Sequence, residues 1–193
     1  MKGIASWLSL FCYKFMVMKS LLFIWCCFIS VGVFGQTPKA IEADLLKLFR
    51  GINTNSSDVD KANTEFSRKL IYYAEKYPAS IKWPFESLKK ENLNISTSSD
   101  NMLRIYSWDT WSGGTMHYFE SVFQYKVADK TKTLSDASKA VVDDRPSYYR
   151  LYTFNADGKT YYLAIWRGIG SSKDAETGIH SFTIENKELK RSK

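Results

Sequence analysis

Residues 59–97 read VDKANTEFSRKLIYYAEKYPASIKWPFESLKKENLNIST, and the spacing of their apolar side chains changes partway from helical to alternating. Before Pro78, apolar residues recur at steps of three and four, as they do on one face of a helix. The residues of this stripe are Val59, Ala62, Phe66, Leu70, Tyr73 and Tyr77. Residues 93–97 instead alternate between apolar and polar, which is typical of a strand. The chain is therefore predicted to change from helices to strands after Phe85.

A second helix is predicted upstream. Thr37 and Pro38 form a typical cap and first turn, and Gly51 stands where this helix is expected to end. Its apolar face consists of Ile41, Leu45, Leu48 and Phe49. Ser57 is expected to cap the helix that follows. The link of residues 52–56 is short, which favours an antiparallel helix pair.

Downstream, alternating apolar residues predict about six strands. They cover residues 93–97, 103–106, 115–127, 147–154, 159–167 and 179–184. Asp157 and Gly158 supply the positive φ of a tight hairpin between the fourth and fifth of these ranges. We therefore predict an α+β protein, with an N-terminal antiparallel helix pair followed by a mainly antiparallel sheet of about six strands. The helices are expected to cover one face of that sheet.

The strand expected over residues 115–127 has two different faces. Apolar Phe119, Phe123, Tyr125 and Val127 alternate with polar Glu120, Gln124 and Lys126. Such a pattern predicts one buried face and one face in water.

Two polar segments complete the predicted fold. Residues 130–144 are expected to hold a short helix around Leu134, Ala137 and Val141. Residues 187–193 are rich in lysine and arginine and are expected to form a flexible, solvated tail.

The first 35 residues have the composition of a leader. They contain three lysines, no acidic residue and apolar runs over residues 4–11 and 21–34. Read from Met18, they form a basic start, an apolar stretch and a cleavage site at Gly35, which predicts a signal peptide and a mature chain beginning at Gln36. The alternative is an uncleaved membrane anchor, although residues 21–34 are short for a span that needs about 20 residues. The chain is thus expected to be periplasmic or secreted, with no stable membrane span after cleavage.

Length, cysteine positions and net charge limit the kinds of protein that the mature chain could be. The 193 residues fit the leader, residues 1–35, and a single domain, residues 36–193. Cys12, Cys26 and Cys27 all lie in the leader, so the mature chain has no disulfide, thiolate nucleophile or cysteine-bound metal. Without the three leader lysines, 24 basic residues stand against 20 acidic ones, and the net charge falls from +7 to +4. The lysines are scattered, which does not favour nucleic acid as a partner.

No catalytic motif is recognisable. His117 and His180 each stand in phase with apolar strand residues, which favours structural roles over metal binding or catalysis. No Gly-x-Ser-x-Gly occurs, and residues 168–173 lack the spacing of a phosphate-binding loop, so they are predicted to form a turn. We therefore expect no cofactor, no metal site and no catalytic set.

The most unusual segment contains Trp108, Asp109 and Trp111, followed by two glycines. The two tryptophans differ by an odd number of positions, so a regular strand would send them to opposite faces. Trp108 is expected to close the core. Trp111 with Asp109 is expected to offer an aromatic surface beside a carboxylate, which suits a sugar or a peptide. The alternative is that both tryptophans are structural.

Four motifs resemble a group of exported proteins from Gram-negative bacteria that have no known function. They are RIYSWD at 104–109, GGTM at 113–116, YYL at 161–163 and GIGSSKD at 168–174. The resemblance covers roughly residues 93–189. It implies a shared exported fold and transfers no catalytic residue.

These observations leave three hypotheses. The first is an exported, non-enzymatic binding domain of the cell envelope or the extracellular space, with a ligand such as a glycan or a peptide. The second is a hydrolase of glycan or peptide that uses carboxylates such as Asp109 and Glu120, which would have to face each other at roughly 5 to 9 Å. The third is a subunit of an envelope assembly, which would expose an apolar patch of several hundred Å².

Overall fold

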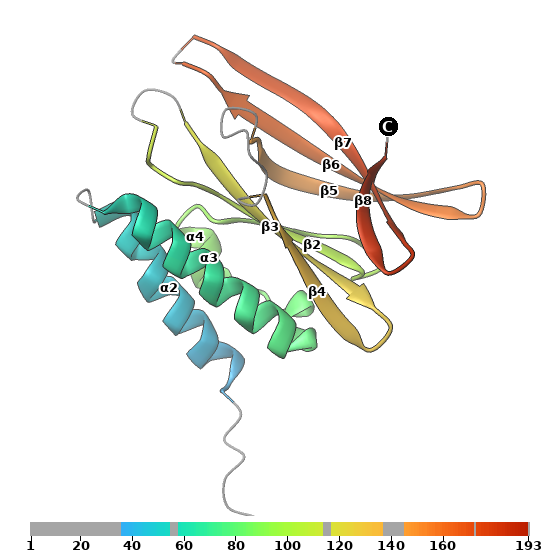
Figure 1. The fold of residues 1–193 in the computed structure, drawn as a ribbon, viewed down its shortest axis with the longest axis horizontal. Coiled ribbons are helices and arrows are strands. Elements are labelled where there is room, and N and C mark those ends of the chain that lie inside the picture. The colour runs from blue at the N-terminus through green and yellow to red at the C-terminus, as the bar shows by residue number, and fades with distance from the viewer. Residues whose placement is uncertain (1–35, 55–57, 114–116, 137–144, 172, 193) are drawn as a thin grey trace, which may run out of the picture. The chain divides into compact units, whose positions relative to one another are not determined.

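Helices cover one face of a four-stranded sheet, and a second four-stranded sheet covers its other face (Figure 1). The computed structural model describes residues 36–54, 58–113, 117–136, 145–171 and 173–192. The predicted signal peptide, its start at Met18 and the three cysteines lie outside these ranges. The segment Thr37–Lys193 forms one compact unit. No helix in the described ranges is long and apolar enough to cross a membrane.

The helices occupy the first third of this unit and the strands the remainder. The helices are α2 (Pro38–Thr54), α3 (Val59–Lys76), the 3₁₀ helix η1 (Pro78–Lys82) and α4 (Glu86–Lys90). The first sheet contains β1 (Asn94–Thr97), β2 (Leu103–Asp109), β3 (Phe119–Val127) and β4 (Lys130–Ser135). The second contains β5 (Ser147–Ala156), β6 (Lys159–Ile169), β7 (Ala175–Glu185) and β8 (Glu188–Ser192).

Local side chains set the ends of the two long helices. Thr37 caps α2 as predicted, because its Oγ1 accepts the N–H of Ala40 at 3.2 Å. The helix does not end at Gly51 but continues to Thr54, since the buried Ile52 anchors the last turn in the core. Asp58 caps α3 by accepting the N–H of Lys61, whereas Ser57, the predicted cap, lies outside the described residues.

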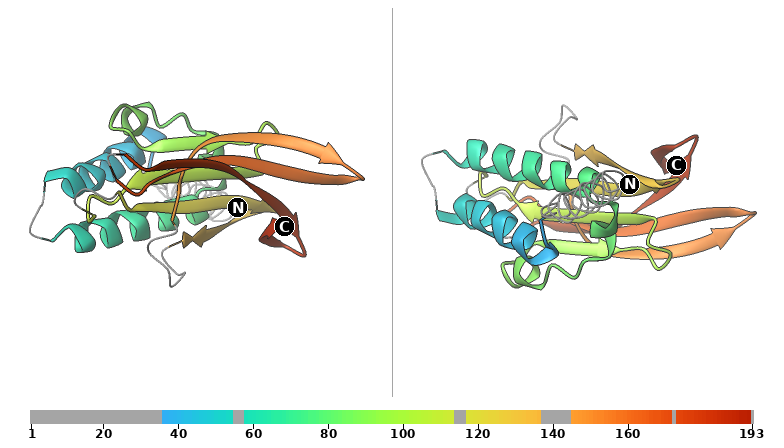
Figure 2. Two further views of the ribbon diagram at one scale, coloured as in Figure 1. Left: turned by 90° about the horizontal axis from the view of Figure 1, so that it is seen from above. Right: turned by 90° about the horizontal axis from the view of Figure 1, so that it is seen from below.

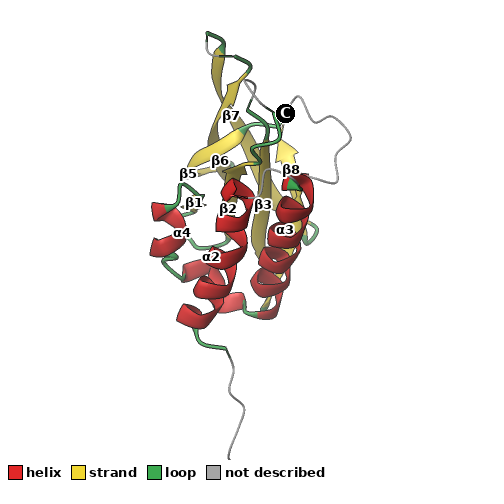
Figure 3. Cartoon of the chain, turned by 90° about the vertical axis from the view of Figure 1, so that its left-hand side faces the viewer, coloured by secondary structure: helices red, strands yellow, loops and turns green. Residues whose placement is uncertain are grey.

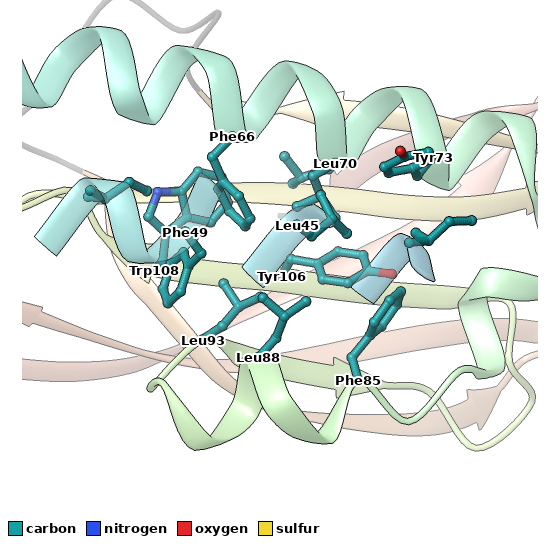
Figure 4. Close-up of a cluster of buried hydrophobic side chains, with 13 residues drawn as sticks. Leu45, Phe49, Phe66, Leu70, Tyr73, Phe85, Leu88, Leu93, Tyr106 and Trp108 are labelled. Carbon is teal, nitrogen blue, oxygen red and sulfur yellow. The ribbon is translucent and has the colours of Figure 1, made fainter. Parts of the chain in front are cut away.

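The predicted helix pair is present, and η1 and α4 extend the helical layer beyond it (Figure 3). Side chains of α2 and α3 interleave over the first sheet, together with residues of α4 and β2 (Figure 4). The labelled core residues include Leu45, Phe49, Phe66, Leu70, Tyr73, Leu88, Tyr106 and Trp108. The hydroxyl of Tyr73 also donates a hydrogen bond of 2.6 Å to Oδ2 of Asp44, which ties α3 to α2.

The α+β class is confirmed, but a single sheet of about six strands is wrong. Eight strands form two antiparallel sheets with the orders β1-β2-β3-β4 and β5-β6-β7-β8. The strands missed by the prediction are β4 and β8, which lie at sheet edges and contain few apolar residues. Each follows a short turn with a left-handed non-glycine residue, Ala128 before β4 and Asn186 before β8.

These two strands replace the predicted short helix and the predicted flexible tail. Leu134 lies in β4, opposite Phe123, while Ala137 and Val141 are outside the described residues. Leu189 of β8 is buried in the core between the sheets and pairs with Ile184. Packing of one apolar side chain in each segment against this core, with Leu189 buried and Leu134 partly buried, accounts for pairing that the polar composition does not predict.

Strand β3 has no wet face over most of its length. Residues 115–116 lie outside the described ranges, and the regular strand begins at Phe119. Phe123 packs against the second sheet, while Gln124 points to the helices and donates to the carbonyl of Ala74 at 2.9 Å and to Oγ of Ser80 at 2.8 Å. The predicted polar face is therefore buried, because the helices cover it and its amide finds hydrogen-bond partners there.

The two sheets share a second core. From the first sheet it takes Leu103, Ile105, Phe123 and Tyr125, and from the second Tyr148, Tyr162, Ala164, Phe182 and Leu189. The Asp157–Gly158 turn has positive φ at both residues, as predicted, and the β5–β6 hairpin extends well past the helical layer (Figure 2). Among the described helices and strands, none packs on the face of β5–β7 that points away from this core.

Candidate functional site

The indole of Trp108 lies between β2 and α3 (Figure 4). Only 1% of this residue is exposed, and its Nε1 donates a hydrogen bond of 2.9 Å to Oδ1 of Asn63. The ring meets Phe66 edge to face, with 5.0 Å between ring centroids. Trp108 is thus part of the core and is not open to a ligand.

Trp111 lies in the solvent, with 58% of the residue exposed. Its backbone has left the strand and adopts the left-handed conformation, with φ at 57°. A non-glycine residue rarely adopts this conformation unless its surroundings hold it there. Asp109 stabilises this conformation, because its Oδ1 accepts a hydrogen bond of 2.9 Å from the N–H of Trp111. The indole is therefore presented on a fixed turn.

The same carboxylate binds the imidazole of His117, through Oδ2 and Nδ1. The backbone N–H of His117 donates to the carbonyl of Ile169 at 3.2 Å, in an isolated β-bridge that joins the two sheets. The imidazole stacks on Phe119 and meets the edge of Trp111, each with 6.3 Å between ring centroids. Asp109 engages Nδ1, and within the part of the chain that the structure describes the other ring nitrogen, Nε2, forms no hydrogen bond.

The sequence prediction placed Trp111 and Asp109 together but did not connect them with His117. It assigned His117 a structural role at the end of a strand, and the bridge to Ile169 agrees with part of that role. The contact between Asp109 and His117 could have been predicted from their positions at the ends of two strands. Asp109 ends β2 and His117 precedes β3, so the two face each other across the loop that joins neighbouring antiparallel strands.

Asp109 and Glu120 are not placed as a facing pair. They occupy successive registers, Asp109 opposite Phe119 and Glu120 opposite Trp108, so their side chains leave opposite faces of the sheet. Glu120 is buried under α3, where Oε1 accepts a hydrogen bond of 2.7 Å from Oγ of Ser67. This pair does not supply the two carboxylates that glycoside hydrolysis requires across a cleft.

Burial also changes the acidity of Glu120. Loss of water around its carboxyl group raises the pKa above the ordinary value. The hydrogen bond from Ser67 and the charge of Arg145 lower the pKa and oppose this effect, while the charge of Asp136 adds to it. Glu120 is therefore a buried acid of the helix–sheet interface.

His180 lies beside a small polar cavity of about 290 Å³. Its Nδ1 is 2.8 Å from the hydroxyl of Tyr148, and its ring packs against Trp166 with 5.1 Å between centroids. Burial raises the pKa of the Tyr148 phenol, so this hydroxyl stays protonated and provides hydrogen bonding rather than charge. Arg145 and Arg191 also line the cavity.

The turn predicted over residues 168–173 begins only at Gly170, because Gly168 and Ile169 still pair with Glu176 and Ala175 at the end of β6. Oγ of Ser171 accepts the N–H groups of Lys173 and Asp174, both at 3.2 Å, and the N–H of Gly170 donates to the carbonyl of Asp174. These N–H groups bind within the loop and do not form a phosphate cradle. Among the residues that the structure describes, no group of three His, Cys, Asp or Glu side chains is arranged to hold a metal ion.

Of the predicted site residues, Asp109 and Trp111 lie in one loop, where the Asp109 carboxylate binds the backbone of Trp111 and the ring of His117. Trp108 belongs to the core instead. No protein-family model, no curated protein and no solved structure matches the chain.

Proposed function

We propose that the chain from Gln36 onward is an exported, non-enzymatic binding domain of the cell envelope or the extracellular space, which contacts its ligand through Trp111. Export rests on the basic and apolar leader of residues 1–35. The binding role rests on one observation. Trp111 is 58% exposed and Asp109 holds its backbone in an unfavourable conformation, so the fold maintains an exposed indole at a cost.

The chemistry around Trp111 favours a glycan over other ligands. A pyranose ring has apolar faces that stack on an indole and hydroxyl groups at its edge that need hydrogen-bond partners. His117 and Asp109 supply polar atoms next to the indole, and the His117 ring lies edge to face with it. A peptide with an aromatic or proline side chain is the other ligand that this arrangement suits.

A hydrolase finds less support in the geometry. Its two named carboxylates leave opposite faces of the sheet, and Glu120 is covered by α3. The Asp109 carboxylate is engaged by the Trp111 N–H and by the His117 ring. An acid that maintains the shape of a loop in this way suits a binding role.

The test is a titration of intrinsic tryptophan fluorescence against a panel of glycans and peptides. Binding should change the emission of the native chain, and Trp111→Ala should abolish the signal and weaken binding at least tenfold in a label-based assay, since stacking is lost. Tyr72→Ala is the matched control, because Tyr72 is 47% exposed on α3, away from this loop. A ligand that binds Trp111→Ala as tightly as the native chain would refute the assignment.

A further inference from the structure

The second sheet carries an exposed apolar surface, which we call the outer face. Its outward side chains lie in register on three strands, with Phe154 beside Tyr161, Tyr152 beside Leu163, and Ile165 beside Ile179. Tyr152 is 48% exposed, Phe154 55% and Ile179 60%. In soluble proteins a contiguous apolar patch of this kind marks an interaction surface.

Away from the β5–β6 turn, where Lys159 and Glu185 form an ion pair at 3.3 Å, the outer face carries only positive charge. Arg150 pairs with Ile165 and Arg167 pairs with Thr177, and both guanidinium groups are exposed. No aspartate or glutamate occupies an outward position over residues 150–154, 161–167 and 177–181. Neither arginine forms an ion pair within the part of the chain that the structure describes. The complementary partner is therefore apolar and anionic.

The shape and composition of the outer face select among such partners. The paired aliphatic side chains of Ile165 and Ile179 offer a sugar neither stacking nor hydrogen bonds. A second copy docked face to face would bring together the arginines of both copies with no carboxylate between them. None of the pockets whose linings are described is lined by Tyr152, Phe154 or Ile179, so these pockets offer the outer face no hollow for an anchoring side chain of a protein partner.

We propose that the outer face docks on the surface of an anionic phospholipid bilayer. Tyrosine and phenylalanine side chains partition into the headgroup region, where Tyr152 and Tyr161 keep their hydroxyls in contact with water. Arg150 and Arg167 bind lipid phosphates, for which a guanidinium group is well shaped. A bilayer is flat, and it therefore meets a sheet face without requiring a matching surface. This binding mode does not depend on Trp111.

The experiment is cosedimentation of the chain beginning at Gln36 with lipid vesicles. That chain contains every described helix and strand, and all of it after Gln36 forms one compact unit; it lacks the apolar leader, which would itself bind lipid. One vesicle preparation is phosphatidylcholine mixed with phosphatidylglycerol, and the other is phosphatidylcholine alone. We expect the chain to bind only the mixed vesicles. This binding should weaken with added salt, because salt screens the attraction between the arginines and the anionic lipid.

Two double variants test the two parts of the outer face. Arg150→Gln with Arg167→Gln should lower the partition coefficient about 25-fold, taking about fivefold for each arginine near an anionic surface. Tyr152→Ser with Phe154→Ser should lower it by a similar factor. The matched controls on α3 are Arg68→Gln, an exposed arginine, and Tyr72→Ser, a tyrosine with nearly the same exposure as Tyr152; both should bind like the native chain.

Several results would overturn the proposal. They are the absence of binding to mixed vesicles, equal binding to both preparations, and binding that the arginine pair does not change. Light scattering provides the remaining test, because a dimer that the same variants dissociate would assign the outer face to a second copy. Thermal unfolding of each variant separates a loss of binding from a loss of folding.

Discussion

At the scale of single residues, the loop after β2 separates two tryptophans that are three positions apart. Trp108 follows the alternation of β2 and is 1% exposed, whereas Trp111 has left the strand and is 58% exposed. The odd spacing was enough to predict this division. The His117 partner of Asp109 could not be predicted in the same way, since alternation within a strand says nothing about which side chains meet across a loop.

We expect Trp108→Ala to destabilise the fold by about 3–5 kcal/mol. The substitution leaves a cavity under α3 and removes the hydrogen bond partner of Asn63, which is itself buried. Trp111→Ala should change the free energy of unfolding by less than about 1 kcal/mol, because its indole contributes little to either core. Chemical denaturation of both variants measures the two values. Equal, large losses would mean that Trp111 is also structural.

Gly178 lacks room for a side chain because the indole of Trp166 packs against it, and not because of its backbone conformation. A Cβ atom at this position would lie 2.6 Å from Cζ2 of Trp166, which packs across the β6–β7 pair. Gly178→Ala should therefore destabilise the protein by about 1–3 kcal/mol through overpacking. Gly51→Ala is the control, since no atom lies within 4 Å of the added Cβ and helix propensity favours alanine by about 0.5–1 kcal/mol. Thermal denaturation should move in opposite directions for the two variants.

Glu120 should make the stability of the fold depend on pH. Its pKa is raised in the folded state, mainly by burial, so the folded chain holds this proton more tightly than the unfolded chain does. The folded state therefore loses stability as pH rises from the ordinary carboxyl pKa through the raised one. Glu120→Gln removes this loss, and its stability relative to the native chain should grow over the same pH range.

The measurement is urea denaturation of the native chain and Glu120→Gln between acidic and neutral pH. Ser67→Ala provides a second test, because it removes the hydrogen bond that lowers the pKa of Glu120. In this variant the pH range of the loss should extend upward. A constant difference between Glu120→Gln and the native chain at every pH would contradict the interpretation.

At the scale of elements, apolar periodicity identified the segments that contribute several side chains to a core. It predicted α3 from its stripe and the β5–β6 hairpin from its Asp-Gly turn. It missed β4 and β8, since an edge strand with one apolar residue packed on the core has no period to detect. It also assigned a wet face to β3, because Glu120 and Gln124 are polar residues that are buried with hydrogen-bond partners.

The stripe of α3 should account for much of the attachment of the helical layer. Phe66, Leu70 and Tyr73 are all buried against the first sheet and α2, as predicted. Leu70→Ala should cost about 2–5 kcal/mol in unfolding free energy, whereas Arg68→Ala, on the exposed side of the same helix, should cost less than about 0.5 kcal/mol. Equilibrium unfolding in denaturant compares them. Similar small losses would show that the stripe does not carry the packing.

At the scale of the whole molecule, the described elements begin two residues after the predicted cleavage site. Helix α2 starts at Pro38, and Thr37 caps it. We expect the protein isolated from its native envelope or medium to begin at Gln36, since cleavage after Gly35 leaves the cap and all described elements intact. N-terminal sequencing tests this directly. A sequence that included residues 21–35 would indicate an uncleaved anchor.

Because the first sheet lies between the helices and the second sheet, its central strands should be the last part of the molecule to exchange their backbone amide protons. The backbone amides of β2 and β3 lie between neighbouring strands on both sides, and their side chains are buried on both faces. Separation of the helices exposes one face of these strands, and separation of the second sheet exposes the other, but neither event alone frees their amides. Deuterium should therefore enter β2 and β3 only through global unfolding, while the β5–β6 hairpin tip exchanges through small local openings.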